Sequence, residues 1–511
     1  MKRLICIATI VLTAHLVALA SAQTLRVGCG ADRYSKAEDY LTFCKWDPNA
    51  WITEPLVSRG ADYTPKSSLI ERWEKNGNTY RLHVRPKVRF HNGAPLDAQA
   101  IKHSLALYSQ NRSEFLRIDP ASYRIIDPST LEFTSNQSTV HFIGLLSHPF
   151  VCAYAPGTDA VNAPVGTGPF IFKAYRRDRY LKVTRNEDYW GEKAPNREVT
   201  FRFISDPQAR AMALINNEVD IAYPVDPQTL MALPPKGDYQ TIVSPINSYL
   251  LLTVNIHGEP PFDTLKDERV RKALAFAINR KTIADIAYLG KAKPAKTFLA
   301  PWFWNQGEAF LDGYGFDPDQ AARLLDQAGW QLKPDGMRYK SGHPLKLRLV
   351  SGWPNASVLK PVPELLQQML RKVGVTLELI QTDDDGVYYG NYMGPGQGDL
   401  FLEKAGNTGL TPDWLLYMLY HSQTPWLESG YKWSLPGEEF DHYVDLIRSN
   451  MDPESVKENL QQAQRVIVDK VCAIIPLLYI PDIYLARKNI RFNPDAGGGY
   501  VKLGYAQKVS P

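Results

Sequence analysis

The sequence predicts an α/β fold in two lobes joined by a hinge, and three observations support this. A chain of 511 residues is too long for a single hydrophobic core, which indicates two or three domains. Strand patterns alternate with helix patterns from Asn162 to Asp220. Two apolar, β-rich runs, Tyr249–Ile256 and Ala473–Leu485, lie far apart in the chain and are typical of buried strands. Two such extended crossings would form the hinge.

The composition is that of an ordinary globular protein. Hydrophobic residues make up 44% of the chain and charged residues 22%, which argues against disorder. The formal net charge of +4 is small for this length. No basic cluster interleaved with aromatic side chains is present, so we do not expect nucleic acid as a partner.

The stretch from Asn162 begins with a constrained turn. Pro164 and Pro169 bracket the Gly166–Gly168 segment, where glycines permit backbone conformations that a Cβ would forbid. Apolar and polar residues then loosely alternate over Phe170–Thr184 and again over Val199–Ile204. These two runs predict a hairpin-like pair of strands.

A helix and a further strand are predicted next. Asp206 stands where an N-cap would, and Pro207 occupies the first helical position ahead of an alanine-rich apolar run. Asn217 ends this helix, and the chain is expected to return as a strand over Val219–Tyr223.

This order of turn, two strands, helix and strand resembles the family 5 extracellular solute-binding proteins of ABC importers. That family includes oligopeptide, dipeptide, nickel and haem or glutathione binders. Three further blocks, Asp62–Ala106, Phe262–Asp285 and Phe316–Trp330, are similar to family patterns and occur in the family order. The resemblance implies an α/β, two-lobed periplasmic binding protein (type II, cluster C-like) with an extra subdomain in lobe one.

The expected domain layout is discontinuous. Lobe one would comprise residues 23–255, including the extra subdomain at about 65–164. Lobe two would comprise residues 256–479, and residues 480–511 would return to lobe one. A ligand held between two lobes contacts both, so it stabilises the closed form by its higher affinity for that form.

The amino terminus predicts export. Two basic residues precede the apolar run Leu4–Ala20, which ends in small residues typical of a secretory cleavage site. Residues 1–22 are therefore a predicted signal peptide, and Gln23 would begin the mature chain. An uncleaved membrane anchor is the alternative, but the apolar run is short for a spanning helix. No cysteine stands at the cleavage site, which favours a freely diffusing periplasmic protein over a lipoprotein.

Four cysteines remain after cleavage: Cys29, Cys44, Cys152 and Cys472. In an oxidising compartment they allow three disulfide pairings, and the short loop between Cys29 and Cys44 favours that pair. Small buried thiols are the alternative. A metal site is disfavoured, because the cysteines show neither a Cys-x-x-Cys spacing nor an adjacent histidine.

The resemblance also implies ligand contacts from both lobes. Glu54 occupies a place that faces the ligand in relatives, Tyr249 begins a hinge strand, and Asn407 and Trp414 lie in the segment that lines the pocket from lobe two. Asn407 falls near the position where peptide-binding relatives carry an aspartate that pairs with the ligand's amino group. Asp413 could replace that aspartate after a shift in register, but a carboxylate in the first turn of a helix is the favoured interpretation.

Other ligand classes stay open. The segment comparable to one that carries an arginine in nickel-binding relatives, Ser147–Pro156, has no arginine, and His148 is a possible substitute. The tryptophans and tyrosines of lobe two could stack on a sugar or a planar conjugate.

We expect no enzymatic activity, cofactor or resident metal. Gly-x-Ser-x-Gly, Walker and His-Glu-x-x-His motifs are absent, and the acidic run Asp383–Asp385 lacks the spacing of a calcium loop. The predicted function is capture of a peptide or peptide-like solute and its delivery to ABC permease subunits in the inner membrane, by a monomer. Nickel or a metallophore complex, or an oligosaccharide or opine-like conjugate, are alternative ligands. A periplasmic hydrolase or a sensory protein without transport would be a different class.

Overall fold

The computed structural model describes most of the chain. The described residues are 24–30, 51–60, 64–111, 116–137, 139–148, 151–159, 163–301, 303–307, 311, 313–352, 361–382, 384–406, 411, 413–424, 432–450, 452–494 and 503–509.

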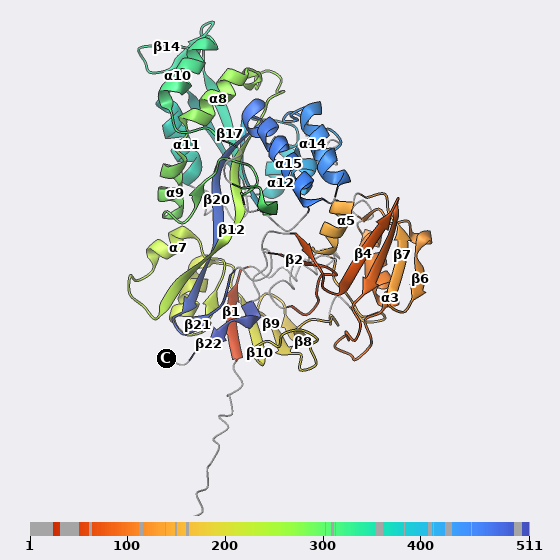
Figure 1. Cartoon of the computed structure of the whole chain (residues 1–511). Coiled ribbons are helices and arrows are strands. Elements are labelled where there is room, and N and C mark those ends of the chain that lie inside the picture. The colour runs from red at the N-terminus through yellow and green to blue at the C-terminus, as the bar shows by residue number, and fades with distance from the viewer. Residues whose placement is uncertain are drawn as a thin grey trace, which may run out of the picture.

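One large mixed sheet runs through the molecule. It has 11 strands, in the order β18-β17-β19-β12-β20-β11-β1-β10-β9-β8, with β13 paired to β20. The long strands β12 (Tyr239–Val254) and β20 (Ile474–Arg487) pair antiparallel in the middle of this order, with register shifts near their centres. Both predicted apolar crossings lie in these two strands. Figure 1 shows two bodies joined by them.

We call the body that contains β1, β8–β11 and the four-stranded sheet the first lobe, and the body that contains β17–β19 the second lobe (Figure 1). Strands of the first lobe that join the large sheet are β1 (Thr24–Cys29), β8 (Phe170–Arg176), β9 (Tyr180–Arg185), β10 (Glu198–Phe203) and β11 (Ile221–Ala222). Its helices next to this sheet are α6 (Pro207–Ile215) and α7 (Pro227–Ala232), and a small ladder is formed by β21 (Ile490–Arg491) and β22 (Gln507–Lys508).

The stretch predicted as two strands forms three. The run over Phe170–Thr184 divides into β8 and β9, which pair with each other, and β10 then pairs with β9. The turn between β8 and β9 contains neither glycine nor proline. Asp178 takes a left-handed conformation there, with φ +54°. Because aspartate tolerates this conformation better than most residues, the turn forms without the residues that usually indicate one.

The predicted helix is present as α6. Asp206 is its N-cap, and the Asp206 side chain accepts a hydrogen bond from the Ala209 amide at 2.6 Å. Asn217, with φ +62°, follows the end of the helix. The next strand, β11, is shorter than predicted.

The four-stranded sheet has its own hydrophobic core. Its order is β4-β5-β7-β6, and it packs with α3 and α5 around buried side chains such as Tyr80, Phe133 and Phe142. The elements of this region are β2 (Ser58–Arg59), β3 (Pro65–Lys66), β4 (Ile70–Asn76), β5 (Thr79–Val84), α3 (Ala98–Asn111), β6 (Arg124–Asp127), β7 (Thr130–Thr134) and α5 (Thr139–Leu146).

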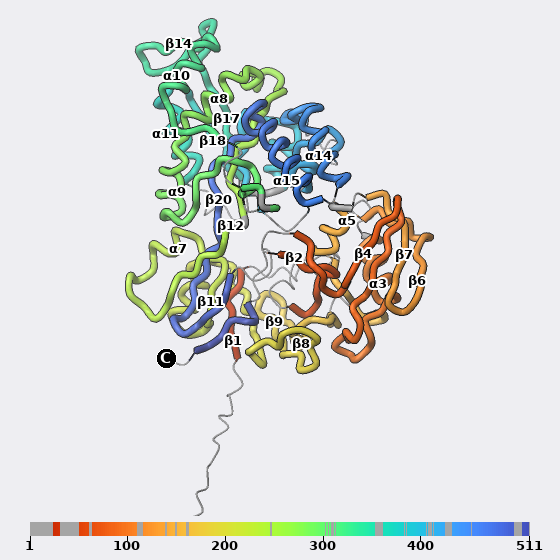
Figure 2. The backbone as a smooth tube through the Cα atoms, viewed as in Figure 1, coloured from red at the N-terminus to blue at the C-terminus, as the bar shows by residue number. Residues whose placement is uncertain are grey.

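The second lobe has a separate and larger core, to which strands β12, β17, β19 and β20 and most of its helices contribute. Its strands are β13 (Lys293–Pro294), β14 (Gln331–Leu332), β15 (Arg338–Lys340), β16 (His343–Pro344), β17 (Lys346–Gly352), β18 (Thr376–Thr382) and β19 (Leu400–Gly406). Its helices are α8 (Glu268–Ala277), α9 (Arg280–Tyr288), α10 (Pro318–Gln327), α11 (Pro361–Arg371), α12 (Asp385–Val387), α13 (Trp414–Tyr420), α14 (Glu438–Ser449) and α15 (Pro453–Gln464). Figure 2 shows the chain passing between the lobes along β12 and β20.

Candidate functional site

The ends of the parallel strands place a site at the boundary between the lobes. In the first lobe β1 runs parallel to β10 and β11, and in the second lobe β17 runs parallel to β18 and β19. Since β11 and β19 are both antiparallel to the strands that cross between the lobes, all six carboxyl ends point toward that boundary. Ligands of open α/β sheets bind outside such ends.

The Gly166–Gly168 turn packs directly against the backbone of Trp51 and Ile52 in the first lobe. A Cβ on Gly166 would lie 2.2 Å from the Ile52 carbonyl oxygen, and a Cβ on Gly168 would lie 2.1 Å from that of Trp51. The Gly168 amide donates to the Ile52 oxygen at 3.0 Å. Only glycine permits this close approach of two backbones.

Glu54 follows this backbone contact closely in the chain and is buried. Its carboxylate accepts hydrogen bonds from the Thr167 hydroxyl at 2.8 Å, the Tyr189 hydroxyl at 2.6 Å and the Trp190 indole at 3.0 Å. The Glu54 side chain is buried, and the described residues around it, 51–57, form an irregular segment. Desolvation and the Glu54 charge raise the pKa of the Tyr189 hydroxyl. A carboxylate that accepts hydrogen bonds from three donors has few lone pairs left for a ligand. The ligand contact predicted for Glu54 stays a prediction.

Tyr249 lies within the core of the second lobe. It is buried in β12 and packs against Phe298 and Tyr479, with ring centroids 6.0 and 6.2 Å away. The Tyr249 ring therefore contributes to packing of the core. The ligand contact predicted for Tyr249 stays a prediction.

A polar group lies on the first-lobe side of the crossing strands. The Tyr223 hydroxyl donates to Asp482 Oδ2 at 3.0 Å, and the Tyr223 ring stacks on Tyr484 at 4.3 Å. Burial and the charge of Asp482 raise the pKa of Tyr223. The Asp482 amide donates to the Ser244 hydroxyl, so the contacts connect β11, β12 and β20 near the boundary.

Asp413 is fully buried and faces one basic side chain from each lobe. Its Oδ2 lies 3.3 Å from His141 Nδ1 and 3.5 Å from Arg448 Nη1. Asp413 precedes α13 as its N-cap residue, but its side chain makes no capping hydrogen bond. Burial by itself raises the pKa of the Asp413 carboxyl, yet the charges of His141 and Arg448 offset this and hold that pKa below its ordinary value. The favoured interpretation from the sequence, a first-turn carboxylate on the helix dipole, misses these contacts.

The partner histidine comes from the other lobe. His141 belongs to α5 of the first lobe, and its ring stacks on Trp414 with centroids 5.7 Å apart and an interplanar angle of 19°. His141 Nδ1 also lies 3.3 Å from the Thr411 hydroxyl. Trp414, a predicted ligand contact, is thus engaged between the lobes on one face. Neither His141 nor Arg448 follows from the sequence, because no local pattern in α5 or α14 indicates that these side chains meet Asp413.

Another buried carboxylate lies on β19. Glu403 accepts a hydrogen bond from the Thr253 hydroxyl, which in turn lies 3.0 Å from the Tyr420 hydroxyl. Burial raises the pKa of Glu403 to about 7.

Two predicted residues, Asn407 and Cys44, lie outside the described residues. Asn407 therefore stays a predicted ligand contact. Cys29, at the end of β1, is a free cysteine among the residues that the structure describes, and its predicted disulfide with Cys44 stays a prediction. His148 is buried, and its backbone amide donates to the Leu145 oxygen at 2.9 Å.

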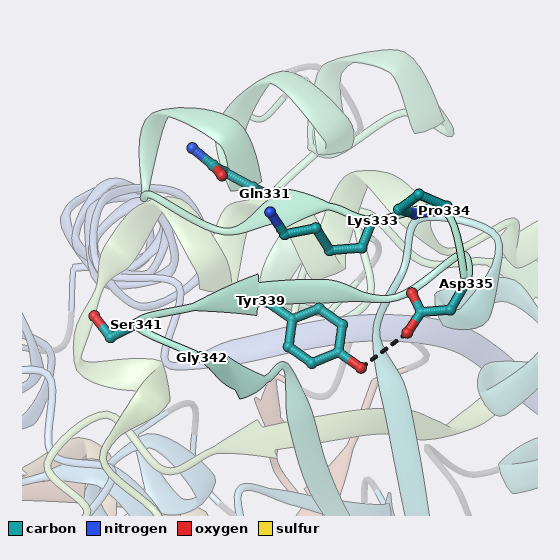
Figure 3. Close-up of a pocket in the computed structure, with 7 residues that line it drawn as sticks. All are labelled: Gln331, Lys333, Pro334, Asp335, Tyr339, Ser341 and Gly342. Atoms are coloured by element: carbon teal, nitrogen blue, oxygen red, sulfur yellow. Dashed lines mark hydrogen bonds between the residues drawn. The ribbon is translucent and has the colours of Figure 1, made fainter.

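A surface hollow of about 610 Å³ lies in the second lobe at the three-stranded sheet β14-β15-β16. Figure 3 shows Lys333 and Tyr339 beside it, with the Tyr339 hydroxyl donating to Asp335 Oδ2 at 2.9 Å. Its lining side chains are mainly exposed, and it lies away from the strand ends at the lobe boundary (Figure 1).

Across the described ranges, no group of three or more histidine, cysteine, aspartate or glutamate residues is placed to hold a metal ion. None of the helices in the described part of the chain combines the length and apolar character needed to cross a bilayer.

Comparisons with known proteins agree on one family. Residues 64–425 match the family described as "Bacterial extracellular solute-binding proteins, family 5 Middle". The nickel-binding periplasmic protein of Escherichia coli K12 is 31% identical over 362 residues, which are 66% of this chain and 67% of that protein. The glutathione-binding protein GsiB of Salmonella paratyphi A is 28% identical over 469 residues, which are 86% of each chain.

Solved structures share the fold. NikA from Brucella suis in complex with Fe(III)-EDTA superposes with a TM-score of 0.80 at 24% identity, over 95% of this chain and 100% of that one. The binding protein DppA from Helicobacter pylori in complex with the peptide STSA gives 0.71 at 20% identity, over 95% and 98%.

Proposed function

Since the chain belongs to the family 5 bacterial extracellular solute-binding proteins of ABC importers, we propose that it captures a peptide or peptide-like solute between its lobes. The similarity to glutathione-binding proteins, which covers 86% of each chain, carries this proposal. Glutathione is itself a peptide. The captured solute would pass to ABC permease subunits in the inner membrane.

The geometry of Asp413 gives the proposed site a particular charge. Because His141 and Arg448 already face its carboxylate, Asp413 offers no uncompensated negative charge to a ligand ammonium. We infer that Asn407 and the second face of Trp414 meet the ligand from the second lobe. A neutral amide would favour a ligand whose amino end is hydrogen-bonded rather than ion-paired.

Nickel or a chelate of nickel is the second candidate ligand. The nickel-binding protein of Escherichia coli has 31% identity to this chain, which favours it. The chain has no arginine between Ser147 and Pro156, where the sequence comparison expects one in nickel-binding relatives. This departure places nickel second, ahead of an oligosaccharide or opine-like conjugate.

Export and assembly complete the proposal. Residues 1–22 would be removed as a signal peptide, and the mature protein would act as a periplasmic monomer without catalytic activity. Stoichiometric capture without turnover distinguishes this from a periplasmic hydrolase. A requirement for the neighbouring permease and ATPase in uptake distinguishes it from a sensory protein.

The test is native mass spectrometry of protein purified from its own periplasm, with release and identification of bound molecules. Titration calorimetry would then use reduced glutathione, the tetrapeptide Ser-Thr-Ser-Ala and Ni(II) with L-histidine. We expect a bound peptide mass and measurable affinity for a peptide probe. Binding only of the nickel complex, or recovery of a sugar conjugate, would overturn the peptide assignment.

A further inference from the structure

The lobes touch on the side away from the crossing strands. Figure 1 shows α5 of the first lobe beneath α14 of the second lobe, with β12 and β20 on the other side of the molecule. Buried residues of α5 belong to the core of the four-stranded sheet, whereas those of α13 and α14 belong to the core of the second lobe. The contact therefore joins two hydrophobic cores that share no residue.

The contact is close enough to exclude a single methyl group. A Cβ added to Gly144 of α5 would lie 2.2 Å from Thr411 Cγ2, and the three atoms nearest to that Cβ all belong to Thr411. Apart from the neighbours of Gly144 in the chain and the backbone of α5, no described atom of the first lobe lies within 3.4 Å of this position. Alanine would favour the α5 helix more than glycine does, so the helix itself gives no reason for a glycine at this position. The close approach of Thr411 from the second lobe does give one.

Polar and charged side chains also meet at this contact between the lobes. Asp413 of the second lobe is fully buried, and His141 of the first lobe is 4% exposed at its side chain. Arg448, also of the second lobe, approaches Asp413 from α14, and its guanidinium carbon lies 3.6 Å from the centre of the Tyr417 ring. Moving the lobes apart would expose Asp413 to water on the side of His141 and remove its cross-lobe partner.

We propose that α5, Thr411, Asp413, Trp414 and Arg448 form a clasp that holds the two lobes closed on the side away from the hinge. Gly144 permits the approach, His141 stacks on Trp414, and Asp413 lies between His141 and Arg448. The clasp biases the lobes toward closure before any ligand binds, so a ligand needs less binding free energy to close them. It also makes ligand release depend on separating His141 from Asp413.

The distance between the lobes tests the clasp without a ligand. Spin labels on unnatural residues at the exposed positions Glu71 and Glu454, one in each lobe, report that distance by double electron–electron resonance. We expect a short-distance population in the unliganded mature protein. The variant Gly144→Ala should lose most of it, since its methyl group overlaps Thr411.

A second substitution separates the clash from misfolding. Adding Thr411→Ser to Gly144→Ala removes the methyl group at 2.2 Å, leaves Thr411 Cβ at 3.2 Å and keeps the hydroxyl that lies near His141. This double variant should recover most of the short-distance population. Gly390→Ala is the matched control, because a Cβ on this other helical glycine meets nothing within 4 Å, and it should leave the distances unchanged.

The variant Asp413→Asn tests the contribution of the Asp413 charge to the clasp. We expect the ratio of closed to open protein to fall at least about tenfold. An unchanged short-distance population in Gly144→Ala, or failure of Thr411→Ser to restore it in folded protein, would overturn the clasp. Because no ligand takes part, such a failure leaves the proposed peptide capture untouched.

Discussion

At the scale of single residues, two buried glutamates have opposite surroundings. Glu54 receives three hydrogen-bond donors, which compensate its charge, whereas one hydroxyl donates to Glu403. Burial costs a charged carboxylate several kcal/mol unless donors or cations offset it. Glu54 is therefore expected to stabilise the fold as an anion, and Glu403 is expected to be tolerated best when protonated.

Replacing Glu54 tests whether it anchors the fold or meets the ligand. Glu54→Gln puts an amide N–H against donors, so we expect a loss of about 1.5–3 kcal/mol in the free energy of unfolding, measured by urea denaturation. The control Glu198→Gln breaks the exposed ion pair with Lys173 and should cost at most about 1 kcal/mol. Normal stability together with weakened ligand binding would instead support the predicted ligand contact.

The raised pKa of Glu403 predicts how the stability of the protein depends on pH. An unfolded glutamate titrates at about 4.3, whereas the folded pKa is about 7. The folded protein holds the proton in that window, so the glutamate's contribution to stability falls as pH rises from about 4.3 to about 7. Glu403→Gln should therefore stabilise the protein at pH 8, by up to roughly 3 kcal/mol, and change little at pH 4.

Thermal unfolding at both pH values measures this difference. The control is Glu378→Gln on β18, which pairs with Lys346 at 3.0 Å and whose pKa is lowered, first by its hydrogen bond from that lysine. It should not gain stability at pH 8. An equal effect of Glu403→Gln at both pH values would contradict a protonated Glu403.

At the scale of elements, the start of α6 is predicted from the sequence and the β8–β9 turn is not. The four helices α6, α7, α10 and α15 each begin with Asp-Pro, and in each the aspartate accepts a hydrogen bond from a backbone amide of the first turn. That pattern is complete within four residues and can be read from the sequence. The β8–β9 turn lacks glycine and proline, so the same approach merges two strands into one.

A cap substitution tests the element scale. Asp206→Ala removes the acceptor for the Ala209 amide, and we expect a loss of about 1 kcal/mol in stability. Asp206→Asn retains an acceptor oxygen and should cost clearly less. Chemical denaturation of the three proteins measures the difference, and equal losses would show that the cap contact adds little.

At the scale of the whole molecule, separate cores imply separate cooperative units. The core of the four-stranded sheet and that of the second lobe share no buried residue, and the large sheet and the α5 contact connect the two lobes. Such units can unfold at different free energies. A ligand held between the lobes would couple them, because it binds only when both are folded.

Calorimetry tests this separation. For the unliganded mature protein we expect a calorimetric enthalpy of unfolding larger than the van't Hoff enthalpy. A saturating bound ligand should raise the midpoint and bring the two enthalpies together. A single two-state transition without ligand would contradict independent units.

The sequence by itself determined the α/β class, the family and the start of α6, because these depend on periodicity, on capping within four residues and on blocks in a fixed order. Only the tertiary structure decided that Gly166 and Gly168 receive the Trp51–Ile52 backbone. It alone paired Asp413 with His141 across the lobes. Such contacts join residues more than a hundred positions apart, and their energies depend on burial and distance, which no local pattern encodes.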